Sequence, residues 1–513
     1  MKTLRLAQTG SGLLGALASL LLASTASADE PRKATEPKVL EEPGDVTTVV
    51  DAFDGDDLFD LSITLGYQHS RKHANIMRET WIKQPGLSSG GYTASTMNVA
   101  EYAESTSRLN TRLDVALYHD LALYLRMPII LSSSRDLSGL EGSENVQPVV
   151  LAGAPGEQLF ALPFRSTDRS GIEYLAVGVD VNIMNQARDP IRPTWLFGLE
   201  ARFNVSEPMR ACGTATGLNQ DGKQVKCSRP SDVNRNGIAN DYAEQGVPLE
   251  GAKGGERDAG VSRGVTGLEL HTIVSRRIKY VEPYGGFRAL FEFPTGGSDF
   301  GEIDLQGSLV NHPPLEGSMI MGLQIIPWEK REQFQRVTFD ARVAGTYRSE
   351  GRDYSELFDA LGSSDALSIR RPSYASYQAN TDATTAGESP SVVDPNSQKV
   401  YFTGLTDVQA HGTLKVSGAF SWQAGEFVKF QAGIGYTFVQ PHFVTMDQPC
   451  NPDFQGSSGK AGPCRNAASQ GPTFVVTGIP NPNYRPVINH VGRRFKVDDV
   501  SVVDLWFNGI VMF

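Results

Sequence analysis

The feature that most constrains this chain is a period-two alternation of apolar and polar residues, which recurs in twelve segments. In the first segment, Leu61, Ile63 and Leu65 alternate with Ser62 and Thr64. Because successive side chains of a strand point to opposite faces, the alternation predicts strands with one apolar and one polar face. The segments cover residues 59–67, 109–117, 121–129, 175–183, 195–203, 268–274, 285–293, 319–325, 339–347, 414–422, 428–438 and 505–513.

The connections between these segments alternate between short and long. A compact soluble domain seldom holds many long structureless loops. A transmembrane β-barrel has short periplasmic turns, long outer loops and an even number of strands. We therefore predict an all-β fold, a transmembrane antiparallel β-barrel of about twelve strands over residues 58–513, with short periplasmic turns and long extracellular loops. A secreted β-sandwich or soluble barrel is the alternative, but its strands are usually shorter.

The start of the chain has the pattern of a secretory signal. Lys2 and Arg5 precede an apolar run over residues 13–23, and Ala26-Ser27-Ala28 follows. We expect export and cleavage after Ala28. The apolar run is too short for a membrane-spanning helix. Residues 29–57, rich in proline and acids, are predicted to be a periplasmic linker.

Composition and motifs argue against two classes of function. The net charge of −11 disfavours binding to nucleic acid, whose phosphates require basic surfaces. The eight histidines show no metal-ligand spacing, and the chain has neither a nucleophile elbow nor a P-loop. His69 and Ser70 are adjacent and would point to opposite faces of a strand. We therefore expect no enzymatic activity and no nucleic-acid partner.

The signal peptide, the hairpin over residues 118–123, the strand start over residues 281–285 and the terminal Phe513 together resemble a Gram-negative outer-membrane β-barrel, porin-like or a transporter. The resemblance implies a location in the cell outer membrane, surrounded by its lipids. It also implies that the barrel-assembly machinery recognises the last strand, which ends at Phe513. Val511 fits the hydrophobic alternation of such a signal, whereas Asn508 stands where glycine is often found.

If the apolar faces meet lipid, the polar faces line a lumen in which acids and bases nearly balance. A strongly selective ion channel would show a ring of one sign. Balance instead predicts either cross-strand ion pairs that occlude the lumen or a narrow wetted pore with little ionic preference. The predicted lumen-lining residues are Arg112, Asp114, Arg126, Asp180, Glu200, Arg202, Glu269, Arg288, Glu292, Asp340, Arg342, Lys415 and Lys429.

These two possibilities correspond to two candidate functions. A narrow pore or transporter for small solutes requires a wetted lumen. A structural or interaction protein that presents large disulfide-tied surface loops would fit an occluded lumen.

The four cysteines form two local pairs, each within one long loop. Because the chain passes through an oxidising periplasm, we predict disulfides between Cys212 and Cys227 and between Cys450 and Cys464. Neither spacing makes a zinc site in the absence of nearby histidines.

The loop with the first cysteine pair also contains half of a calcium-binding pattern. Asp232, Asn234 and Asn236 supply oxygens at alternate positions, and Gly237 permits a sharp turn. The twelfth position is Ala243 rather than an acid. The segment is therefore either a calcium site or a polar turn, and we expect no other cofactor.

Two further expectations concern an outer loop and the membrane interfaces. Residues 353–361 are compatible with a short amphipathic helix on the fifth outer loop. Aromatic rings favour the lipid–water interface, and the expected interface residues are Trp195, Trp328, Trp422, Trp506 and Tyr436.

Overall fold

The computed structural model describes most of the predicted barrel. The described residues are 46–53, 59–83, 92–141, 158–212, 259–295, 300, 312–364, 366, 369, 403–445, 464–465, 479–480 and 494–513. The expected signal peptide, most of the expected linker, Cys227, Cys450 and the expected calcium ligands Asp232, Asn234 and Asn236 lie outside these residues.

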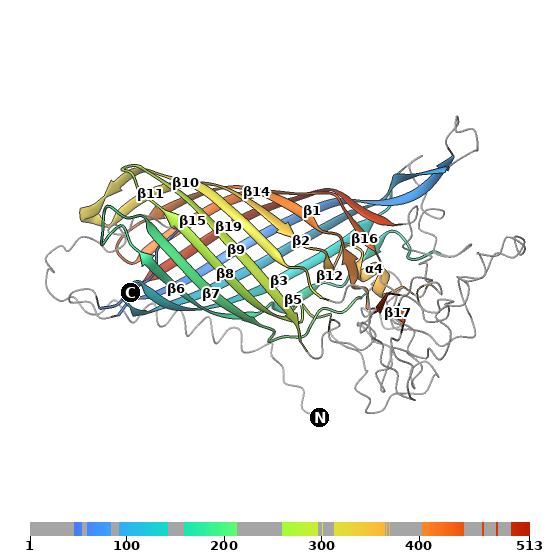
Figure 1. Ribbon diagram of the computed structural model, residues 1–513, viewed down its shortest axis with the longest axis horizontal. Coiled ribbons are helices and arrows are strands. Elements are labelled where there is room, and N and C mark those ends of the chain that lie inside the picture. Colours follow the sequence, from blue (N-terminus) through green and yellow to red (C-terminus); the bar gives the residue numbers. More distant parts are fainter. Residues whose placement is uncertain are drawn as a thin grey trace, which may run out of the picture.

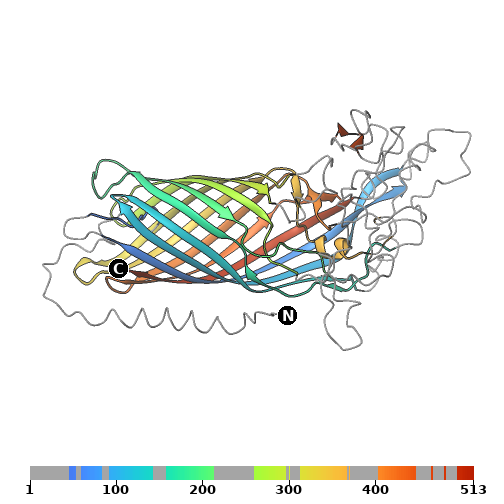
Figure 2. The ribbon, with the colours of Figure 1, turned by 90° about the horizontal axis from the view of Figure 1, so that it is seen from below.

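Twelve long antiparallel strands form a closed barrel, which confirms the predicted fold class. Pairing between β1 and β19, from Ser62 with Met512 to Arg78 with Phe495, closes the sheet. Figures 1 and 2 show the strands running obliquely around the long axis of the barrel. The strands are β1 (Leu61–Lys83), β2 (Tyr92–Tyr118), β3 (Leu121–Ser138), β6 (Leu175–Met184), β7 (Thr194–Phe203), β8 (Val265–Ser275), β9 (Val281–Pro294), β10 (Glu316–Lys330), β11 (Gln335–Arg348), β14 (His411–Gln423), β15 (Val428–Val439) and β19 (Phe495–Met512).

The alternation in the sequence separates an apolar exterior from a polar interior. On β14, Leu414 and Val416 are about half exposed, whereas Lys415 faces the opposite side of the sheet. The same exposed apolar positions recur around the barrel, for example Met319 and Met321 on β10. An apolar surface of this extent is unfavourable in water and is matched by lipid tails, and closure leaves no strand edge to be satisfied in hydrocarbon. The fold is that of a transmembrane β-barrel.

No helix among the described residues is long and apolar enough to cross a membrane.

The two ends of the barrel differ. We call one the turn end, because it carries the connections over residues 119–120, 276–280 and 424–427 and the short helix η5 (Arg331–Gln333) between β10 and β11. The C-terminus lies at this end, on the left of Figure 1. The opposite end, which we call the loop end, carries β12 (Gly351–Asp353), β16 (His442–Thr445) and α4 (Phe358–Gly362).

Short strands extend the sheet at the loop end. β4 (Phe164–Arg165) and β5 (Arg169–Ile172) pair with β3. β12, β13 (Thr406–Val408) and β16 form a ladder that joins β19. β17 (Cys464–Arg465) and β18 (Ile479–Pro480) pair separately.

The first two strands are longer than the alternation predicts. β1 continues to Lys83, and β2 already begins at Tyr92. Beyond Ser70 the outward positions of β1 are the exposed polar residues Arg71 and His73. The apolar signal therefore ends where the strands leave the lipid, although the backbone pairing continues.

Candidate functional site: the barrel interior and its plug

A connected network of charged side chains covers the inner wall formed by β2, β3 and β6 to β9. It contains most of the residues predicted to line the lumen, together with His271. The network joins Arg112 to Asp114 and Asp180, Asp180 to His271, Arg126 and Arg202 to Glu200, and Arg202 and Arg288 to Glu269.

Two smaller clusters lie on the remaining wall. Arg342 lies 3.5 Å from Asp340, which also accepts a hydrogen bond of 2.7 Å from Tyr284. Lys415 Nζ donates a hydrogen bond of 2.6 Å to Asp504, which also accepts one from Ser70.

The other two predicted lumen residues lie near the ends of the barrel. Glu292 pairs with Arg263, at 2.8 Å, at the loop end. Lys429 lies second in β15, close to the turn at residues 424–427.

These ion pairs run along the wall because glycines on the inner face let long side chains lie flat. The ring of Tyr124 on β3 lies over Gly178 on β6, where a Cβ would overlap it, and reaches Glu200 on β7. The guanidinium of Arg112 lies 4.0 Å above the same ring. A long side chain thus passes over the glycine of the neighbouring strand and reaches the strand beyond it. Among the described barrel strands, ion pairs lie within one strand or join strands that are adjacent or one apart.

The same arrangement of glycine, aromatic ring and cation occurs twice more on the inner wall. Tyr284 lies over Gly322, with Arg342 5.5 Å from the ring centre. Trp506 lies over Gly433, with Lys415 5.9 Å from the ring.

Trp506 was expected at the lipid interface. It instead alternates with the exposed Leu505 and Phe507, and therefore faces the interior. The inner-face glycine provides the space that makes this orientation possible.

A segment of the chain packs against the inner wall at the loop end of the barrel. This plug segment, residues 351–364, includes β12 and α4. Leu357 and Leu361 are fully buried in an apolar cluster with the inward-facing Ile76 and Val497. Phe358 packs on a second apolar cluster, which includes Val265 of β8. Of the helix expected over residues 353–361, only the last four residues are helical, as part of α4, and α4 packs in the mouth of the barrel.

The three acids of the plug segment are each bound by cations of the surrounding wall. Asp353 forms ion pairs with Arg263 at 2.8 Å and with Arg348 at 2.9 Å. Glu356 lies 2.6 Å from Lys72 Nζ. Burial alone would raise the pKa of Glu356, but attraction by Lys72 and His442 outweighs it and lowers that pKa to about 2.

Of the three acids, Asp359 makes the contacts that are most completely buried. Its carboxylate accepts hydrogen bonds of 2.5 and 3.1 Å from Arg169 and one of 3.1 Å from the backbone N–H of Cys212. Cys212 itself is disulfide-bonded. Its partner lies outside the described residues, so both predicted disulfide pairings stay predictions.

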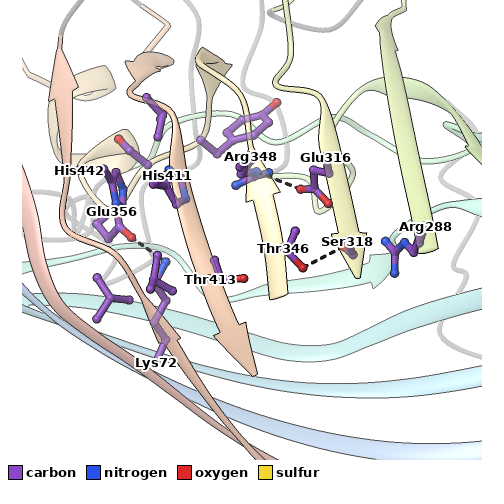
Figure 3. Close-up of a pocket in the computed structure, with 15 residues that line it drawn as sticks. Lys72, Arg288, Glu316, Ser318, Thr346, Arg348, Glu356, His411, Thr413 and His442 are labelled. Atoms are coloured by element: carbon purple, nitrogen blue, oxygen red, sulfur yellow. Dashed lines mark hydrogen bonds and ion pairs between the residues drawn. The ribbon is translucent and has the colours of Figure 1, made fainter. Parts of the chain in front are cut away.

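A polar cavity of about 380 Å³ lies between the plug segment and the wall of the barrel. Figure 3 shows Glu356 and Lys72 on one side of it and Arg348, Glu316 and Arg288 on the other. Hydroxyl groups complete the lining, among them the pair Ser318 and Thr346, whose oxygens are 2.8 Å apart.

Two stacked histidines form part of the cavity lining. The rings of His411 and His442 are 4.0 Å apart and nearly parallel. Each Nδ1 lies within 2.9 Å of a backbone carbonyl, which can only accept, so each Nδ1 carries the proton. Burial lowers the pKa of His442, although Glu356 opposes the shift.

The turn end is narrowed by residues 46–53, from the region expected to be a linker. Val49 packs on the inward-facing Ala122 and Leu196. Asp51 forms an ion pair of 2.5 Å with Arg188, and Thr47 contacts Ser275 at 2.8 Å. This part of the chain therefore packs against the inner wall.

The structure brings one serine and histidine together on the outer face. His69 Nδ1 lies 3.1 Å from Ser107 Oγ, which also accepts from Tyr67. Of the serines, the sequence places only Ser70 next to His69, because cross-strand neighbours depend on the strand register. Within the described part of the chain, no hydrogen bond or ion pair of His69 reaches a carboxylate, so the third group of a catalytic triad is not supplied there.

A closed barrel with an apolar exterior, a charged inner wall and a plugged mouth is an outer-membrane type of β-barrel. No family model and no curated protein sequence matches the chain.

Among solved structures, an outer membrane channel from Pseudomonas putida F1 is 8% identical, with a TM-score of 0.35 over 92% of this chain and 99% of that chain. A deletion mutant of the TodX monoaromatic hydrocarbon channel is 8% identical, with a TM-score of 0.30 over 93% and 94%. The outer membrane protease OmpT from Escherichia coli is 6% identical, with a TM-score of 0.27 over 89% and 96%. Similarities this distant do not assign a function.

Proposed function

We propose that the protein is a narrow outer-membrane channel for small solutes, whose outer mouth is closed by the plug segment. The observation that carries the proposal is the polar cavity beneath the plug segment. The cavity leaves space beside the plug segment for water and small polar solutes, and its charged groups and hydroxyls can hydrogen-bond to them. We place the loop end outside the cell and the turn end in the periplasm.

The ion pairs run along the wall and not across the lumen. This arrangement supports an interior through which solutes can pass once the plug segment moves. Pairs that crossed the lumen would fill it. The pairs on the wall instead lie within one strand or join strands that are adjacent or one apart, such as Arg126 on β3 with Glu200 on β7. The contacts that obstruct the mouth come from the plug segment, through Leu361 and Asp359.

One observation favours the alternative, a structural or interaction protein with an occluded lumen. The plug segment is held by apolar packing as well as by charges, and Leu357, Phe358 and Leu361 have no exposed surface. A plug that never moves would leave the surface loops as the functional part. Conductance decides between the two functions.

The test is single-channel conductance in planar bilayers, for the unmodified protein and for Asp359→Asn. The substitution weakens the contacts with Arg169, so the plug segment should leave the mouth more often and conductance should rise. Asp189→Asn is the matched control, because Asp189 is an exposed turn residue that pairs with Arg192. If neither the unmodified protein nor Asp359→Asn conducts, although both fold, the channel proposal is wrong.

A further inference from the structure

Five cations of the inner wall are more exposed than the acids with which they pair. The side chains of Arg112, Arg126, Arg288, Arg342 and Lys415 are 30–38% exposed, whereas those of their acidic partners are only 3–14% exposed. Because these residues face the interior of a closed barrel, their exposed surface belongs to the lumen. The lumen therefore presents mainly cations.

The acids are recessed because the wall itself satisfies them. Glu200 accepts a hydrogen bond from Tyr124, and Asp504 accepts from Ser70 and Gln68 as well as from Lys415. These donors hold each carboxylate against the strands. Arginine and lysine carry more N–H groups than one carboxylate uses, and their longer side chains extend further from the wall.

We propose that the lumen selects small anions, carboxylates in particular, over cations of similar size. The inference rests on the proposed channel function and names its substrate class. Formal charges along the wall nearly balance, which by itself predicts little selectivity. An ion in the lumen, however, lies nearer to the exposed cations than to the recessed acids, and the interaction of charges weakens with distance.

The carboxylates of the plug segment indicate which chemical group the cations of the wall bind. Its three carboxylates occupy cationic positions at the loop end, with Glu356 on Lys72, Asp353 on Arg348 and Asp359 on Arg169. Two of these cations, Lys72 and Arg348, line the cavity together with Arg288. A carboxylate that entered when the plug segment moved would meet the same groups.

The test is the reversal potential of the channel under a gradient of KCl and then of potassium acetate. It is measured for the unmodified protein and for Asp359→Asn, in which the plug segment is weakened. We expect an anion-to-cation permeability ratio of roughly five, below the roughly thirty-fold ratio that one unpaired unit charge about 4 Å from each ion in water would give, because the recessed acids offset part of the attraction. Adding Arg342→Gln and Lys415→Gln to Asp359→Asn should shift the ratio toward cations.

Arg192→Gln in the Asp359→Asn protein is the matched control, because it removes an exposed cation from a turn outside the lumen and should leave the ratio unchanged. A gel shift on boiling checks that each variant is a folded barrel. Conductance without anion preference, or a preference that survives loss of Arg342 and Lys415, overturns the inference and leaves the channel function standing. Absence of conductance in every folded variant overturns the channel function itself.

Discussion

Arg169 and Asp359 are separated by 190 residues, yet the guanidinium of Arg169 donates two hydrogen bonds to the Asp359 carboxylate, at 2.5 and 3.1 Å. Arg169 belongs to β5 at the barrel rim, and Asp359 belongs to α4 in the plug segment. Both side chains are almost completely buried. The closed mouth is therefore held by a desolvated ion pair between wall and plug.

The first prediction concerns Arg169→Gln. Removing one partner of a buried ion pair costs up to about 3–5 kcal/mol. Arg135, which lies 3.9 Å from Asp359, offsets part of that cost here. We expect faster hydrogen exchange in residues 351–364, with little change in strands such as β7. Replacing both partners, Arg169→Leu with Asp359→Leu, should restore part of the protection because no lone charge is then left.

Arg165→Gln is the matched control for that experiment, because Arg165 and Asp136 form an exposed pair at the same rim. An exposed ion pair contributes at most about 1 kcal/mol. Equal exchange in the Arg165 and Arg169 variants would show that the plug segment is not held by the Arg169–Asp359 pair.

The second prediction is a dependence of closure on pH. The pKa of Glu356 is lowered to about 2, because attraction by Lys72 and His442 outweighs the effect of burial. A depressed pKa in the closed state means that this contribution to closure is complete above the ordinary pKa of 4.5 and is lost as the pH falls toward 2. Conductance should stay constant from neutral pH to about 5 and rise below about 4.

Glu356→Gln should weaken that rise in conductance without abolishing it. The pKa of Asp353 is also lowered, since Arg263 and Arg348 outweigh its burial, so Asp353 contributes in the same direction. Glu350→Gln, an exposed acid just before the plug segment, is the control and should leave the pH profile unchanged. A conductance that falls on acidification would contradict the assigned role of Glu356.

The sequence predicted the barrel because lipid imposes one rule on every spanning strand. An outward residue such as Val416 must be apolar, and its neighbour Lys415 must face the interior, so alternation carries the fold. The same alternation also predicted the charged residues of the inner wall. It stopped at the membrane surface, where the outward positions of β1 become polar at Arg71 and His73, while inward positions such as Ile76 remain apolar.

Contacts between distant segments were not predictable from alternation. The plug segment enters the mouth because Leu357 and Leu361 meet inward apolar residues of strands far away in the sequence, such as Val497. Its periodicity predicted a helix but not its location. The inward orientation of Trp506 depends on Gly433 of the neighbouring strand, and strand register is needed to find that pair.

The third prediction tests the cysteine pairs. Peptides from a non-reduced digest should link Cys212 to Cys227 and Cys450 to Cys464, because short local loops close most readily in an oxidising compartment. The backbone of Cys212 contacts Asp359. Reduction should therefore also accelerate hydrogen exchange in the plug segment. A peptide that links the two cysteine pairs to each other would contradict the local pairing.

The last prediction concerns the glycines beneath the interior rings. At Gly178 a Cβ would overlap the ring of Tyr124, which is buried and hydrogen-bonded to Glu200. Gly178→Ala must therefore displace the ring into the lumen and should destabilise the barrel by about 1–3 kcal/mol, the usual cost of overpacking. Gly345→Ala is the matched control, because a Cβ there has no neighbour within 4 Å, and the change should be neutral or slightly stabilising. Urea unfolding in detergent measures both variants, and equal midpoints would mean that the inner-face glycine does not position Tyr124.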